Sequence, residues 1–160
     1  MPIPGWAVLI GHAAASLVRN LISTVIVGIV AVLLGYRAAG GLGGVLGAAG
    51  VVALWITAIT AIFTVVGLFA KTPQAASGYG FIFLFLPYLS SAFVPIATMP
   101  SWLKPIATFQ PCTPVIESIR ALLNGHPQGA DLLLAFAWCG GFVAVATLLC
   151  IWAFPRRISH

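Results

Sequence analysis

The sequence predicts an all-α fold: a polytopic membrane helix bundle of four transmembrane helices, with a short interfacial amino-terminal helix and short amphipathic helices on the outer side. Two observations carry this prediction. Of the 160 residues, 61% are hydrophobic and only 6% are charged, against about 25% charged residues in a soluble domain. The apolar residues also gather in uncharged runs of about 20, the length that crosses a bilayer. A soluble globule is excluded, and so is a disordered chain, which needs low hydrophobicity.

Four apolar runs within this single domain, residues 1–160, are predicted to span the membrane: 17–36, 45–70, 75–94 and 132–154. The glycine-rich stretch before the second span is expected to be a turn. Lys71 follows that span, and Arg156 follows the fourth. Pro87 lies inside the third span, where it is expected to kink the helix without ending it. Four crossings place both termini on the same side of the membrane.

Two segments lie outside these spans. In residues 1–16, apolar side chains such as Trp6 and Leu9 share one helical face and His12 lies on another, which predicts an interfacial helix. Residues 96–131 contain five prolines and are predicted to form an extracellular re-entrant region.

One amphipathic helix is expected within residues 96–131. Thr113-Pro114 has the residue types of a helix start, and Asn124-Gly125 those of a stop. Glu117 and Arg120 can form an ion pair at i,i+3. This helix would lie on the membrane surface or dip into it, and Trp102 nearby suits an interface.

The net charge of +5 does not predict nucleic-acid binding, because the basic residues are scattered and punctuate the apolar runs. Four of them fall on the side of the termini and three on the other, so the positive-inside rule favours cytoplasmic termini. On the terminal side are Arg19, Lys71, Arg156 and Arg157, and on the other are Arg37, Lys104 and Arg120.

Catalytic chemistry is not predicted. Glu117 and Asp131 are the only acids and stand 14 residues apart, and Lys71-Thr72 lacks the glycines of a phosphate-binding loop. The three cysteines show no metal-binding spacing, and Cys112 is expected to be a free thiol in a polar loop. The chain is therefore expected not to be an enzyme.

Two patterns in the second span leave alternatives open. Thr57, Thr60 and Thr64 share one helical face, which could line a translocation path or contact a helix; alternatively each hydroxyl bonds a carbonyl of its own helix. Gly40-x-x-x-Gly44 and Gly43-x-x-x-Gly47 match the close-packing motif of membrane helices, or they belong to a loop.

The stretch from Phe85 to Gly125 resembles a signature of the type-2 ABC exporter permeases, especially the bacterial daunorubicin-resistance type. In that family a span is followed by Ser-Gly-x-Phe-x-Pro, Met/Leu-Pro-x-Trp-Leu, Asn-Pro-x-Thr and a helix with Arg-x-Leu-Leu-x-Gly. Ala92 replaces the usual Gly, and Gln110 the usual Asn. The matching positions, which with Glu117 are called the outer family motif below, are Ser91, Phe93, Pro95, Pro100, Trp102, Leu103, Pro111, Thr113, Arg120, Leu122, Leu123 and Gly125.

The resemblance implies a six-span family fold of which this chain holds the last four spans and lacks the first two. It also implies that the amino-terminal residues are the end of a cytoplasmic loop that contacts an ABC ATP-binding subunit. The implied partners are that subunit, a second permease copy, the lipid bilayer and a hydrophobic small-molecule substrate, in the bacterial cell membrane. ATP and Mg²⁺ would be held by the partner subunit. The expected coupling segment consists of Pro2, Ile3, Pro4, Trp6, Leu9 and His12.

The predicted function is thus the membrane subunit of an ATP-driven ABC exporter of hydrophobic drug- or lipid-like molecules, in truncated form. One alternative within that class is a permease for polysaccharide or lipid precursors. An alternative from another class is a non-transporting four-span membrane protein or an inactive permease remnant. A neighbouring ATPase gene and an upstream in-frame continuation with two more spans would discriminate these readings.

Overall fold

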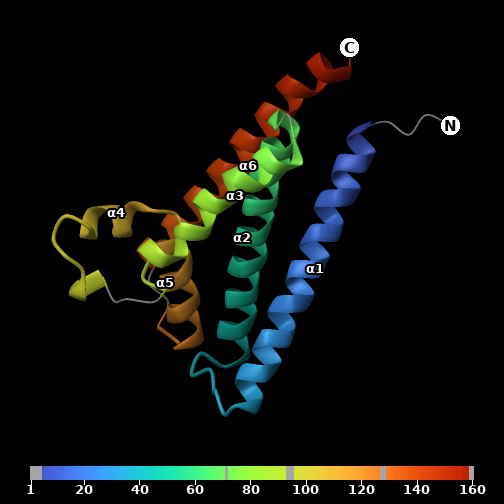
Figure 1. Cartoon of the computed structure of the whole chain (residues 1–160). Coiled ribbons are helices and arrows are strands. Elements are labelled where there is room, and N and C mark those ends of the chain that lie inside the picture. The colour runs from blue at the N-terminus through green and yellow to red at the C-terminus, as the bar shows by residue number, and fades with distance from the viewer. Residues whose placement is uncertain (1–4, 71, 93–95, 127–128, 159–160) are drawn as a thin grey trace.

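The computed structural model describes residues 5–70, 72–92, 96–126 and 129–158 (Figure 1). Helices and turns account for this part of the chain, and no strand occurs in it. The prediction of an all-α membrane helix bundle is confirmed. Its elements in order are α1 (Gly5–Leu33), α2 (Gly41–Phe69), α3 (Pro73–Phe85), the 3-10 helices η1 (Pro87–Leu89) and η2 (Ile96–Thr98), α4 (Lys104–Phe109), α5 (Cys112–Leu123) and α6 (Gly129–Ile158).

Within the described residues, three helices are long and apolar enough to cross a membrane: Ile10–Leu33 of α1, Gly41–Phe69 of α2 and Gly129–Ala153 of α6. Their outward surfaces are apolar. Ile22 and Val25 of α1, for example, are 55% and 59% exposed. Water would not tolerate an apolar surface of this extent, whereas lipid tails cover it at no cost. The helices satisfy their own backbone hydrogen bonds, as a bilayer requires.

The amino-terminal prediction needs a correction. Gly5–Leu33 is one uninterrupted helix, so no separate interfacial helix precedes the first span in the described residues. The polar residues at the expected junction do not break it because they bond to carbonyls of the preceding turn. Asn20 Nδ2 donates to the Ser16 carbonyl at 2.9 Å, and Ser23 Oγ donates to the Arg19 carbonyl at 3.1 Å.

The third span also differs from the prediction, because α3 ends at Phe85 after 13 residues. Its length of about 20 Å is short of the roughly 30 Å hydrocarbon core. Pro87 ends the α-helix and does not kink it. Proline offers no N–H to continue the ladder, and the chain tightens into η1, where Ser90 N–H bonds the Pro87 carbonyl at 3.1 Å.

The glycine-rich stretch before the second span is helix and not the expected turn. Gly43, Gly44 and Gly47 lie in the first turns of α2, which begins at Gly41. Only Gly41 itself has a positive φ, of 59°, among these glycines. The turn before it occupies residues 34–40.

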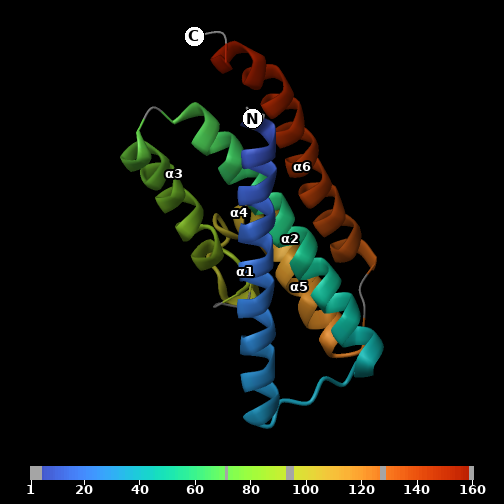
Figure 2. The ribbon, with the colours of Figure 1, turned by 90° about the vertical axis from the view of Figure 1, so that its right-hand side faces the viewer.

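α2 is the central helix of the bundle, and α1, α3, α5 and α6 all pack against it (Figure 2). The core lies where α2, α5 and α6 meet. Small side chains on α2 and α6 let the backbones approach closely, as is usual where membrane helices pack. The buried core cluster comprises Val51, Ala58, Val115, Ala135 and Cys139.

Two short helices share the surface of α2 on this side of the bundle. α3 packs on the second half of α2, where the rings of Phe63 and Phe83 lie 5.3 Å apart. α5 packs on the first half, where Leu122 meets Gly44 and Gly47. The third passage along the bundle is therefore made by α3 and α5 in succession, with α4 folded outward between them (Figure 1).

The start of α1 and the end of α6 lie at the same end of the bundle (Figure 1). This arrangement agrees with an even number of passages. The side of the membrane that they occupy stays a prediction.

Candidate functional site

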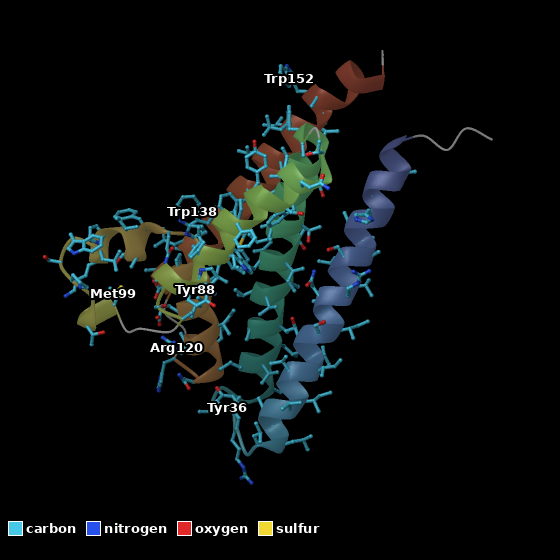
Figure 3. All side chains as sticks on the ribbon, viewed as in Figure 1. Tyr36, Tyr88, Met99, Arg120, Trp138 and Trp152 are labelled. Atoms are coloured by element: carbon cyan, nitrogen blue, oxygen red, sulfur yellow. The ribbon has the colours of Figure 1, made fainter. Side chains whose placement is uncertain are left out.

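Arg120 connects two segments of the outer family motif that are far apart in sequence. Its Nη1 donates to Glu117 Oε1 at 2.8 Å, which confirms the predicted i,i+3 ion pair on α5. Figure 3 labels Arg120 on this helix. Its Nη2 donates to the Ser91 carbonyl at 3.4 Å, across 29 residues of sequence. The Ser91 side chain is 3% exposed, and its Oγ has no hydrogen-bond partner in the described part of the chain. Arg120 thus holds the segment that follows α3 against α5.

The start of α5 differs from the expectation that Thr113 caps the helix ahead of Pro114. The helix begins at Cys112, and its N-cap residue is Pro111. The Thr113 hydroxyl donates instead to the Ala107 carbonyl and accepts a bond from Gln110 Nε2 at 3.4 Å. Thr113 is 4% exposed. The Thr113 side chain therefore connects α5 with α4. No local sequence pattern predicts this hydrogen bond.

The end of α5 docks on the glycines of α2. A Cβ at Gly40 or Gly44 would lie 2.1 or 2.3 Å from the Leu122 carbonyl oxygen, so no side chain fits at either position. The Gly40 N–H donates to the Leu123 carbonyl at 2.9 Å. Gly40-x-x-x-Gly44 is therefore a helix contact within this chain. Gly47 meets the Leu122 side chain, whereas Gly43 faces open space.

The predicted stop of α5 is confirmed. Asn124 is the C-cap, and Gly125 follows it with a φ of 77°. A Cβ at Gly125 would also lie 3.3 Å from the Gly40 Cα. The glycine thus serves both the left-handed backbone and the close approach to α2.

Among the described residues, no hydrogen bond or ion pair joins Pro100, Trp102 or Pro111 of the outer family motif to Arg120. Trp102 is 69% exposed, Pro100 is exposed and Pro111 is half-buried. Phe93 and Pro95 lie outside the described residues.

The expected coupling segment is only partly described. Pro2, Ile3 and Pro4 lie outside the described residues. Trp6 and Leu9 belong to the first turns of α1, and the structure describes their backbone alone. His12 is exposed on α1. The assignment of a coupling role to these residues stays a prediction.

The threonine face of α2 satisfies its hydroxyls within the helix at two positions. Thr57 Oγ1 donates to the Ala53 carbonyl and Thr64 Oγ1 to the Thr60 carbonyl, each at 2.8 Å. Thr57 is exposed, and Thr60 and Thr64 are half-buried. These bonds fit the alternative in which each hydroxyl is bonded locally, and a role in lining a path stays a prediction.

An apolar cleft of about 400 Å³ opens where α3 gives way to α5. Trp55 and Phe63 of α2 and Phe83 of α3 supply its aromatic walls. Cys112 lies at its α5 side, buried in the first turn of the helix and not in a polar loop, which corrects the prediction. The lining residues are Trp55, Ile59, Phe63, Gly80, Phe83, Leu84, Leu86, Pro87, Cys112, Val115, Ile116 and Ile119.

These features define a class of protein. In the described part of the chain no three His, Cys, Asp or Glu side chains are grouped to hold a metal ion. What the fold provides is long apolar helices around a glycine-lined contact and an apolar cleft. The chain is a multi-pass membrane protein.

Comparison with known protein families identifies the family of this membrane protein. Residues 1–124 match the ABC-2 type transporter family, and the chain belongs to that family. It is 30% identical to the daunorubicin resistance ABC transporter permease protein DrrB1 of Streptomyces coeruleorubidus, over 99% of this chain and 57% of the relative. It is 24% identical to a Mycobacterium tuberculosis protein named "Probable doxorubicin resistance ABC transporter permease protein DrrC", over 100% of this chain and 58% of the relative.

The chain therefore spans somewhat more than half the length of the curated relatives that it matches. No solved structure matches it. The resemblance to the type-2 exporter permeases is confirmed at the level of the family, and the relatives are named as permease proteins of ABC transporters.

Proposed function

We propose that this chain is part of the membrane-embedded permease subunit of an ATP-driven exporter. The exporter would move hydrophobic drug- or lipid-like molecules out of a bacterial cell. The observation that carries the proposal is the family match over residues 1–124, together with relatives whose names assign them to daunorubicin and doxorubicin resistance. The apolar cleft between α2, α3 and α5 fits cargo of this class, since clefts of 300–1,000 Å³ suit drug-sized ligands.

ATP and Mg²⁺ would be bound by a separate ABC ATP-binding subunit, and two permease copies would form the working assembly. The first turns of α1 would receive the movement of the ATP-binding subunit, with both termini in the cytoplasm. α2, α5 and α6 would move as one body, because their core side chains are buried together and α5 is fixed to α2 at its glycine end. Closure of the ATP-binding subunits would then shift α1 against that body.

Export of doxorubicin, followed by its fluorescence in cells, tests the proposal. The chain is expressed with an ABC ATP-binding subunit of a transporter of this family, and the control is the same pair with the phosphate-loop lysine of that subunit replaced by alanine. We expect lower doxorubicin accumulation with the intact pair than with the control. Equal accumulation in both, with both proteins present in the membrane, would favour the non-transporting alternative. Export by the chain without any ATP-binding subunit would overturn the proposal.

A further inference from the structure

α1 carries a polar stripe along a span that is otherwise apolar. His12, Ser16, Arg19 and Ser23 follow one another at i, i+4, i+7 and i+11, so they share one face of the helix. Asn20 lies beside this face. All five side chains except that of Ser16 are exposed, and Ser16 is half-buried. α1 packs substantially only on α2, and Figure 3 shows no element on the side of α1 that faces away from α2.

Arg19 lies at membrane depth in this stripe. It is the only Lys, Arg, Asp or Glu in the candidate span Ile10–Leu33. Leu33 is 14 positions further along the helix, which is about 21 Å in a hydrocarbon core of roughly 30 Å. A charge at such depth is costly and is normally paired, so an intramembrane arginine indicates a functional contact.

The described part of this chain offers Arg19 no partner. The neighbouring polar side chains bond within their own helix, as Asn20, Ser23 and Thr24 each donate to a carbonyl four residues earlier. No hydrogen bond or ion pair joins the Arg19 guanidinium to another described residue. Glu117 is engaged by Arg120. Asp131 lies in the first turn of α6, a helix that packs on α2 and α5.

We propose that the α1 stripe is the docking surface for a membrane helix from outside residues 1–160 that carries an Asp or Glu side chain facing Arg19. Charge complementarity requires an acid, and in the described part of the chain neither Glu117 nor Asp131 forms an ion pair with Arg19. The stripe from His12 to Ser23 comprises 12 residues and is about 16 Å long, which matches a seam between two helices better than a single lipid headgroup. A second copy docking its own stripe would place Arg19 against Arg19, so a symmetric pair is disfavoured.

The matched relatives contain sequence beyond the part that this chain covers, and that sequence is one source of such a helix. The inference concerns an interaction surface and does not rest on the proposed transport function. It holds or fails by the binding of an acidic membrane helix, whether or not the chain exports anything.

The test uses the full chain in phosphatidylcholine vesicles with a synthetic Leu/Ala transmembrane helix that carries one central Glu. The matched peptide carries Gln at that position, and association is followed by energy transfer between fluorophores. We expect the Glu peptide to associate about three- to tenfold more tightly than the Gln peptide, the usual range for polar contacts between membrane helices. Arg19→Gln should abolish this preference. Arg37→Gln, which removes the same charge from the 34–40 turn, should keep it.

Gel filtration and circular dichroism establish that both variants are folded before they are compared. Equal association of the two peptides with the unaltered chain would overturn the inference. An undiminished preference in Arg19→Gln would do the same. The vesicles are then remade with phosphatidylglycerol in place of phosphatidylcholine. If this removes the preference for the Glu peptide over the Gln peptide, and Arg37→Gln leaves that preference intact, a lipid phosphate occupies the stripe and the helix proposal is wrong. The remaining outcome is pairing of the chain with itself: if Arg19→Gln strengthens self-association of the chain, and neither peptide changes that self-association, the stripe binds a second copy and the helix proposal is wrong.

Discussion

Replacing Gly44 by alanine tests the contact that fixes the end of α5 on α2. A Cβ at Gly44 would lie 2.3 Å from the Leu122 carbonyl oxygen and 3.2 Å from its carbonyl carbon. Both atoms are backbone, so neither can rotate away as a flexible side chain would. Non-bonded heavy atoms prefer separations near 3.5 Å, and α5 must therefore move away from α2 by roughly 1 Å. Gly43→Ala is the matched control, because its Cβ would meet nothing within 4 Å.

The magnitude follows from what this movement disrupts. Overpacking of a tight contact costs about 1–3 kcal/mol. Loss of the 2.9 Å hydrogen bond from Gly40 N–H to the Leu123 carbonyl adds about 0.5–1.5 kcal/mol. Alanine is the better helix former by about 0.5–1 kcal/mol, which offsets part of the loss. The net expectation for Gly44→Ala is a destabilisation of about 1–3 kcal/mol, whereas Gly43→Ala keeps only the favourable propensity term.

The assay is reversible unfolding of the purified chain by titration with SDS in mixed micelles, followed by circular dichroism. The two variants are compared with the unaltered chain and with each other. Gly44→Ala should unfold at a lower SDS fraction than Gly43→Ala. If the two variants unfold at the same fraction, the docking of α5 on the Gly40–Gly44 surface does not contribute to stability and the reasoning fails.

Three further outcomes are expected. Glu117→Gln should lower the unfolding free energy by no more than about 1 kcal/mol, because the ion pair is partly exposed. Arg120→Ala should cost more, since it also removes the bond to the Ser91 carbonyl, and equal losses would show that this bond contributes nothing. Thr57→Val should leave stability within about 0.5 kcal/mol because the hydroxyl is bonded within its own helix, and reduced export at unchanged stability would assign Thr57 to the translocation path.

Local sequence signals anticipated the parts of the site that depend on local geometry. Glu117 and Arg120 stand three residues apart on a short helix, and their ion pair formed as predicted. Gly125 ended α5 as predicted, because only a glycine adopts its positive φ without strain. Each of these features is decided within a few residues of the chain, so the sequence was sufficient to find it.

Contacts between distant segments were not anticipated. The Gly40-x-x-x-Gly44 pattern predicted close packing, yet it did not identify the Leu122 carbonyl as the group that fills the space. The bond from Arg120 to the Ser91 carbonyl joins residues that no local pattern relates. The buried position of Cys112 was missed because its neighbours are polar and proline-rich in sequence but pack against α2 in space.

By itself, the sequence determined that this protein forms apolar helices in a membrane. Composition and the length of the apolar runs suffice for this conclusion, because the hydrophobic effect and the need for internal backbone hydrogen bonds depend on them alone. Its motif also determined the family. Only the tertiary structure decided that α1 continues through Arg19 without a break and that Pro87 ends a helix instead of bending it. Whether a helix continues past a proline depends on which neighbours satisfy the freed carbonyls and fill the space beyond, and here α5 occupies the next stretch of α2.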